Sequence, residues 1–173
     1  QLDTVKVWEG AMNPVSLVND FIVKSPEWNY YIDAIQTWHY TTVLQSIGHA
    51  TLGLVSELAE LHYVNDFDEL HDEIGDIEYY LSILTWHLGI PDPTFIPKDD
   101  VNLYKIIGYF ADVGKKTAYL QKWNDKTKLR YNAGYNALQC LLQDTYSEAF
   151  PNKDLVTARE AVRSANLAKL SNR

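Results

Sequence analysis

The chain has 173 residues and a formal net charge of −8, from 23 acidic and 15 basic side chains. Hydrophobic residues make up 46% and charged residues 22% of it, which is the composition of a globular domain and excludes a disordered or fibrous chain. Residues 1–97 carry fifteen acids and two lysines, whereas residues 98–173 carry thirteen basic residues and eight acids. Because duplex nucleic acid needs a basic footprint, we expect no nucleic-acid partner, while an acidic first half suits a site for metal ions.

Targeting and redox signals are weak. No apolar run approaches the ~20 residues of a membrane span, so we expect no membrane partner. The first residues lack the cationic and then apolar pattern of a signal peptide. Cys140 is the only cysteine, which excludes an intramolecular disulfide and a cysteine zinc site. We therefore expect a cytoplasmic protein.

Apolar periodicity predicts helices along the whole chain. Asn13 and Pro14 are typical of a helix start, and Gly89 followed by Pro91 is typical of a helix end. The predicted helices cover about residues 14–23, 31–63, 69–88, 101–122, 129–147 and 154–170. Strand signals are nearly absent. The sequence therefore predicts an all-α fold, an antiparallel helical bundle forming a single domain over residues 1–173.

Two pairs of carboxylates flank the predicted turn at residues 65–68. Glu57 and Glu60 are three residues apart on one helix, and Glu73 and Asp76 repeat that spacing on the next. The pair Glu60 and Glu73 and the pair Glu57 and Asp76 share the same midpoint, 66.5, in the sequence. In an antiparallel hairpin the two pairs lie at matching heights, so four carboxylates are expected to converge.

Four converging carboxylates repel one another and shift their pKa values unless a cation neutralises them. All-oxygen ligation suits Mg²⁺, with Mn²⁺ as the alternative. A purely solvated acidic face is disfavoured because Leu58, Leu61 and Ile74 beside these acids are apolar. A di-iron site of the Glu-x-x-His type is also disfavoured, since none of the five histidines stands three residues after a glutamate.

Two segments resemble a known family. The string His49-Ala-Thr-Leu-Gly-Leu-Val-Ser-Glu57-Leu-Ala-Glu60, followed by Glu73-Ile-Gly-Asp76, is similar to the signature of the MazG-like all-α nucleoside triphosphate pyrophosphohydrolases, which are related to the dimeric dUTPases. The closing segment Asn166-Leu-Ala-Lys169-Leu-Ser-Asn-Arg173 resembles that family's closing Asn-x-x-Lys-Leu-x-x-Arg. The resemblance covers roughly residues 45–90 and 155–173, and it implies a MazG-like four-helix core.

The resemblance also implies an activity and a set of site residues. The activity is Mg²⁺-dependent hydrolysis of a nucleoside triphosphate between its α and β phosphates, to a monophosphate and pyrophosphate. The implied metal ligands at the catalytic centre are Glu57, Glu60, Glu73 and Asp76. Contacts to the nucleotide or its phosphates are implied for Asn166, Lys169 and Arg173, whose spacing puts them on one helix face. For the two cations, ordinary solvated charge at a helix C-terminus is the alternative.

Aromatic residues before the acidic motif are candidates for a base pocket. Trp38 and His49, with His39 and Tyr40, are able to stack on a nucleobase, although such residues more often lie in a core or an interface. Members of the family commonly assemble through their helices. We therefore expect a homodimer or a higher homo-oligomer.

Residues 91–160 form a helical insertion between the two resembling segments. Sliding the chain by 59 residues aligns Gly75 with Gly134 but replaces every acid of the motif, so one interpretation is a degenerate second hairpin. An insertion that simply packs on the bundle is the other. Six basic residues lie between positions 115 and 130; a solvated face is the default interpretation, and closure over a triphosphate is the alternative.

Three functional hypotheses follow. The first is a Mg²⁺-dependent pyrophosphohydrolase that acts on a standard, modified or damaged nucleotide. A narrower alternative is a house-cleaning enzyme specific for deoxyuridine or deoxycytidine triphosphate. The third is a non-catalytic helical interaction module that keeps the acidic hairpin as a metal-stabilised scaffold.

Overall fold

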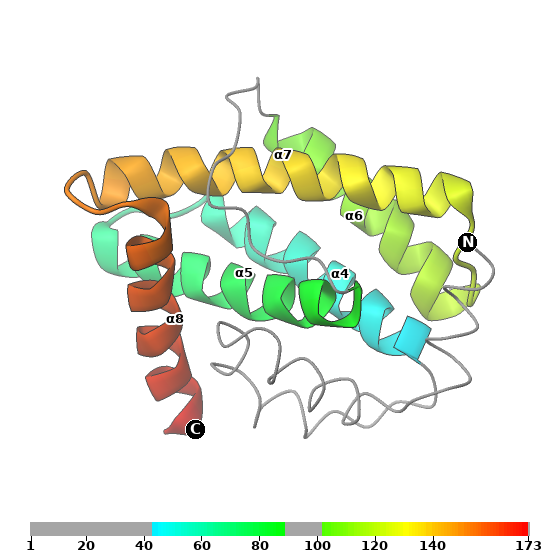
Figure 1. The fold of residues 1–173 in the computed structure, drawn as a ribbon, viewed down its shortest axis with the longest axis horizontal. Helices are drawn as coiled ribbons and strands as arrows, with labels where there is room; N and C mark the ends of the chain where they lie inside the picture. The colour runs from blue at the N-terminus through cyan, green and yellow to red at the C-terminus, as the bar shows by residue number, and fades with distance from the viewer. Residues whose placement is uncertain (1–42, 89–101, 173) are drawn as a thin grey trace.

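The computed structural model describes residues 43–88 and 102–172, which are drawn in colour in Figure 1. Within these ranges the chain forms five α-helices and one short π-helix, with no strand. The elements are α4 (Val43–Leu61), α5 (Phe67–Leu88), α6 (Leu103–Gly114), the π-helix η3 (Lys115–Tyr119), α7 (Asp125–Ala149) and α8 (Leu155–Ser171). The prediction of an all-α helical bundle is confirmed.

Most predicted helix limits lie within a few residues of the observed ones. The largest difference is in the predicted helix over residues 101–122, which ends as an α-helix at Gly114 and continues as one π-helical turn. Just beyond this turn Gln121 has a φ of 51°, which cannot continue a helix. The predicted helix over 14–23, and the first part of the one over 31–63, lie outside the described residues.

The turn between α4 and α5 is capped by side chains. The Asp66 carboxylate accepts a hydrogen bond from the backbone N–H of Glu69 over 2.8 Å, as expected of a helix N-cap. The Glu69 carboxylate reaches back and accepts from the backbone N–H of Asn65, also over 2.8 Å. This reciprocal pattern resembles a capping box and fixes where α5 begins, which in turn fixes the height of its acids against α4.

One apolar core joins the helices. The fully buried residues include Leu54 and Leu58 of α4, Ile74 and Leu81 of α5, and Phe110 of α6. Helix α4 packs against both α5 and α6, and α7 lies along α6 (Figure 1). The carboxylate hairpin therefore rests on a continuous core, which supplies the rigid support that a site requires.

Helix α8 follows α7 after a short turn and crosses the end of the bundle that holds the α4–α5 turn (Figure 1). Asp154 caps its start by accepting a hydrogen bond from the backbone N–H of Thr157 over 2.7 Å. The helix packs mainly against α5 and, to a lesser extent, against α7. This crossing brings the C-terminal segment of the chain to the helix that carries Glu73 and Asp76.

The expected insertion contains α6, η3 and α7, and α6 and α7 pack together beside α4 (Figure 1). Its interpretation as a degenerate second hairpin stays a prediction. None of the helices in residues 43–88 and 102–172 combines the length and the apolarity that a bilayer crossing requires.

Candidate metal centre

The turn between α4 and α5 brings three of the four expected carboxylates together. One carboxylate oxygen from each of Glu57, Glu60 and Glu73 lies within 4.8 Å of the other two. Glu60 is exposed, whereas Glu57 and Glu73 are half-buried at the contact between the helices. Three oxygens at these separations are able to ligate one cation.

Electrostatics within this cluster favour a bound cation. Burial, followed by repulsion from Asp76 and Glu60, raises the pKa of Glu57 to about 8. Burial and repulsion from Glu60 also raise the pKa of Glu73, against a hydrogen bond between the carboxyl groups of Glu57 and Glu73 that lowers it. The cluster therefore retains a proton near neutral pH, and a divalent cation in its place would relieve the same repulsion. The all-oxygen, acidic donor set fits Mg²⁺ or Mn²⁺.

Asp76 lies close enough to raise the pKa of Glu57, but its nearest charged partner is Lys169 of α8. The Lys169 ammonium donates to Asp76 Oδ1 over 2.8 Å and to Asp72 Oδ1 over 2.7 Å. Burial alone lowers the pKa of Lys169, but the hydrogen bonds to the two aspartates outweigh it and raise the pKa. The fourth expected metal ligand is thus held by an ion pair with one of the expected phosphate contacts.

Asn166, another expected nucleotide contact, is buried between α8 and α5. Its side-chain amide nitrogen donates to the backbone carbonyl of Gly75 over 2.8 Å. A Cβ added at Gly75 would lie 2.9 Å from the Asn166 Cβ, closer than real Cβ contacts come. The glycine between Glu73 and Asp76 therefore allows α8 to approach α5 closely.

The remaining expected contacts are placed in part. Trp38 and Arg173 lie outside the described residues. His49 is exposed on α4, in line with Gly53 and Glu57 at four-residue steps, and its ring centroid is 6.1 Å from that of Tyr80 on α5. The residue as a whole is exposed, but the partial covering of its ring by neighbouring atoms removes water and lowers its pKa. It therefore shares a helix face with the carboxylates but lies two turns away from Glu57.

A groove of about 320 Å³ opens beside Lys169, between the start of α5 and the end of α8. Its lining residues are Phe67, Asp68, His71, Asp72, Ala165, Asn166 and Lys169. Both partners of the Lys169–Asp72 ion pair line the groove, so a ligand in it would reach the ammonium group.

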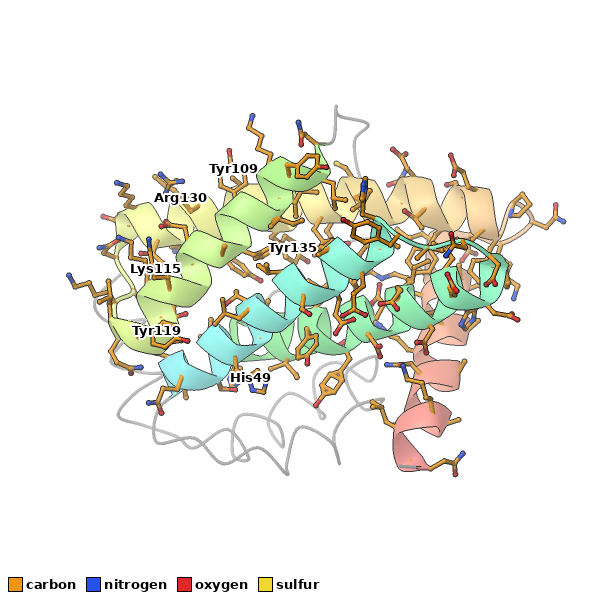
Figure 2. The ribbon with its side chains drawn as sticks, turned by 180° about the vertical axis from the view of Figure 1, so that it is seen from behind. His49, Tyr109, Lys115, Tyr119, Arg130 and Tyr135 are labelled. Carbon is orange, nitrogen blue, oxygen red and sulfur yellow. The ribbon has the colours of Figure 1, made fainter. Side chains whose placement is uncertain are left out.

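The basic residues of the insertion lie elsewhere. Helix η3 packs on the first half of α4, where Ala118 touches Gly48. Figure 2 shows Lys115 and Tyr119 at the same end of α4 as His49. Glu57 is nine residues farther along α4 than Gly48, which is about 14 Å of helix. Within one chain, the solvated-face interpretation of Lys115 and its neighbours is therefore the simpler one.

A buried ionic cluster next to the hairpin was not anticipated from the sequence. Glu78 of α5 is fully buried, and Arg159 and Arg163 of α8 are each 2% exposed. Arg163 places Nη2 2.8 Å and Nε 2.9 Å from Glu78 Oε2, while Arg159 Nη2 lies 3.1 Å from Oε1. Tyr146 of α7 donates its hydroxyl to Glu78 Oε1 over 3.0 Å, and Arg159 donates to Gln139 Oε1 over 2.8 Å.

The sequence did hold a signal for this cluster. Glu78 continues the buried stripe of α5 by standing four residues after Ile74 and three before Leu81, positions that face the core. Arg159 and Arg163 share a helix face at a four-residue spacing. A charge on an apolar stripe, matched by two opposite charges on one face of another helix, is typical of a buried pair.

Comparisons with models of protein families, with curated proteins and with solved structures found no match for this chain. The likeness of its two motifs to the MazG-like enzymes therefore remains a prediction.

Proposed function

We propose that the chain is a Mg²⁺-dependent nucleotide pyrophosphohydrolase that cleaves a nucleoside or deoxynucleoside triphosphate between the α and β phosphates. The observation that supports it most is the meeting of Glu57, Glu60 and Glu73 beside an Asp76–Lys169 ion pair. Such a centre offers anionic oxygens for a cation and, next to them, an ammonium group for a phosphate. The motif resemblance described above supports the same reaction.

In the proposed reaction a water molecule attacks the α phosphorus, and the bond from that phosphorus to the α–β bridging oxygen breaks. The electron pair leaves with pyrophosphate, and the attacking water loses a proton. When bound, Mg²⁺ neutralises phosphate oxygens and withdraws charge from the reacting phosphate. The Lys169 ammonium stabilises the charge that develops on the leaving group, once it exchanges Asp76 for a phosphate oxygen.

Other residues of the site receive supporting roles in this proposal. Glu57 is a candidate to accept the proton of the attacking water, because its half-buried carboxylate lies among the carboxylates that would hold the cation. Asn166, which is held at Gly75 and lines the groove, is a candidate to contact the substrate. His49, with Tyr80 next to it, is a candidate for stacking on the base.

The test is pyrophosphate release from a panel of ribo- and deoxynucleoside triphosphates, with and without MgCl₂. The panel includes dUTP and dCTP, because a house-cleaning specificity for either is the narrower form of the proposal. We expect release from at least one nucleotide that requires the metal. Glu57→Gln and Asp76→Asn should each lower this rate about 100-fold or more, since charge stabilisation of several kcal/mol is removed.

The matched control is Glu148→Gln on α7, which removes an exposed acid far along the chain from the hairpin. It should retain the wild-type rate, and circular dichroism should show all three variants folded. A panel in which no nucleotide is hydrolysed, or hydrolysis that survives both hairpin variants, would contradict the enzyme proposal. Thermal stabilisation by Mg²⁺ without any effect of nucleotide would instead favour the non-catalytic scaffold.

A further inference from the structure

The contacts between α5 and α8 form a regular row. Arg163 meets Glu78, Asn166 meets Gly75, and Lys169 meets Asp72. Each step along this row moves three residues forward on α8 and three residues backward on α5. The row therefore begins at the buried ionic cluster and ends at the ion pair beside the carboxylate hairpin.

Few apolar side chains of α8 are fully buried along this row. The buried residues of α8 are Ala158, Arg159, Val162, Arg163 and Asn166, of which only the alanine and the valine are apolar. Leu155 and Leu170, which are partly buried, pack against the core near the two ends of the helix. The polar contacts between them supply the positional information that decides which residue of α8 meets which residue of α5.

The ionic cluster is able to supply it because a displaced buried charge is costly. Sliding α8 along α5 would leave the carboxylate of Glu78 buried without its arginine partners, a loss that proteins tolerate poorly. Tyr146 of α7 also donates to this carboxylate, so three helices are tied at one point. Burial raises the pKa of Tyr146 well above its usual range, which keeps its hydroxyl proton available for this bond.

We propose that Glu78 is a positioning residue that, through Arg159 and Arg163, sets the height of α8 so that Asn166 and Lys169 reach the carboxylate hairpin. Arg163 is six residues from Lys169, about 9 Å along the helix, so the position of one is transmitted directly to the other. The effect of Glu78 on nucleotide binding rests on the proposed function. Its effect on the contact between Asn166 and Gly75 does not depend on that function.

The deciding experiment replaces the whole ionic cluster by apolar residues. Proteins in which a buried ion cluster is replaced in this way often keep or gain stability. The triple variant Glu78→Leu, Arg159→Leu, Arg163→Met therefore tests the position of α8 without the loss of stability that an unpaired charge would cause. The first readout is the NMR signal of the Asn166 side-chain amide, which donates to Gly75 in the wild type. We expect this signal to shift or split in the variant and its hydrogen exchange to accelerate.

The second readout uses kinetics and metal binding. The KM for the nucleotide should rise about tenfold to 100-fold, because misplacement by about 1 Å is costly at a site. Mn²⁺ affinity should change by no more than about fivefold, which is the effect of freeing Asp76 from Lys169, since Glu57, Glu60 and Glu73 lie on α4 and α5. The matched control is Asp112→Asn, which removes the ion pairs with Lys115 and Arg130 on the α6–α7 hairpin and should change none of these readouts.

An unshifted Asn166 signal together with a wild-type KM in the folded triple variant would overturn the proposal. If the triple variant does not fold, Glu78→Gln is measured in the same way, since it removes the charge and retains the size of the side chain. If no nucleotide is hydrolysed by the wild type, the Asn166 signal alone decides. Failure of the proposed enzyme function is thereby distinguished from failure of the positioning role.

Discussion

The amide group of Asn166 donates a hydrogen bond to the backbone carbonyl of Gly75 over 2.8 Å, although 91 residues separate the two in the sequence. The carbonyl belongs to a residue inside α5, and the approach of the amide depends on the missing side chain of the glycine. This contact joins the helix of Glu73 and Asp76 to the helix of Lys169. It makes the glycine between the two acids a packing position.

Replacing Gly75 by alanine should therefore destabilise the protein. The added Cβ would lie 2.9 Å from the Asn166 Cβ, and overpacking of this kind costs about 1–3 kcal/mol, while the helix gains about 1 kcal/mol from alanine. We expect a net loss of up to about 2 kcal/mol in the free energy of unfolding, measured in urea.

The matched control for this change is Gly108→Ala on α6, where an added Cβ meets no atom within 4 Å. At that position only the higher helix propensity of alanine acts, so the control should stabilise the protein by about 0.5–1 kcal/mol. Equal stabilisation by both substitutions would mean that α8 does not need the space at Gly75.

In the metal-free protein, Glu57 should contribute a loss of stability as the pH rises from about 4.5 to about 8, seen most clearly above pH 7, where His87 no longer contributes. The pKa of Glu57 is raised from its ordinary 4.5 to about 8, so over this range the folded state holds a proton that the unfolded state has released. By linkage, this contribution to stability is complete below pH 4.5 and is lost as the pH rises through 8. Thermal unfolding measured across this range in EDTA should show the decline.

Two comparisons test the assignment to Glu57. Glu57→Gln should flatten the alkaline decline, because the neutral amide has no proton to lose. Mg²⁺ or Mn²⁺ should also flatten it and raise the unfolding temperature most at pH 8, where the ion meets deprotonated carboxylates. A decline of the same steepness in the glutamine variant would assign the effect to other groups.

The buried His87 should give stability the opposite dependence on pH, in the acid range. The ring is buried and pairs with the Ser46 hydroxyl over 2.7 Å, and burial lowers its pKa from 6.5 to about 3. The unfolded state therefore takes up a proton first, so stability is lost as the pH falls from 6.5 towards 3. Because Glu57 acts in the opposite sense over part of this range, the prediction concerns a difference: between pH 7 and pH 4 the urea midpoint should fall more, or rise less, in the wild type than in His87→Gln. The exposed His62→Gln variant should follow the wild-type trend.

The hairpin of the site could be predicted from the sequence because its determinants are local. The spacing of Glu57 and Glu60, the polar turn and the repeated spacing at Glu73 define heights on two consecutive helices, and the Asp66 cap lies inside that turn. Local spacing, a capping residue and apolar stripes are all readable along one chain.

The position of α8 could not be predicted in the same way. It depends on Glu78 meeting Arg159 and Arg163 more than 80 residues away, and on α8 crossing the bundle, which no local pattern encodes. The sequence motifs suggested that Lys169 faces a phosphate. They contained no information that, without one, its ammonium rests on Asp72 and Asp76.

That ion pair leads to a prediction for metal affinity. The Lys169 ammonium lies 2.8 Å from Asp76 Oδ1. A metal ion that binds this carboxylate therefore has to displace the ammonium group. Lys169→Met should therefore bind Mn²⁺ roughly two- to fivefold more tightly, corresponding to the ~0.5–1 kcal/mol of a partly exposed ion pair. The same variant should bind a nucleoside triphosphate more weakly, because the charge proposed to meet the phosphates is gone.

Titration calorimetry measures both affinities, with Lys128→Met, which replaces an exposed lysine of α7, as the control. Tighter metal binding in both variants would indicate a general effect of net charge, whereas tighter binding in Lys169→Met alone would assign it to competition for Asp76.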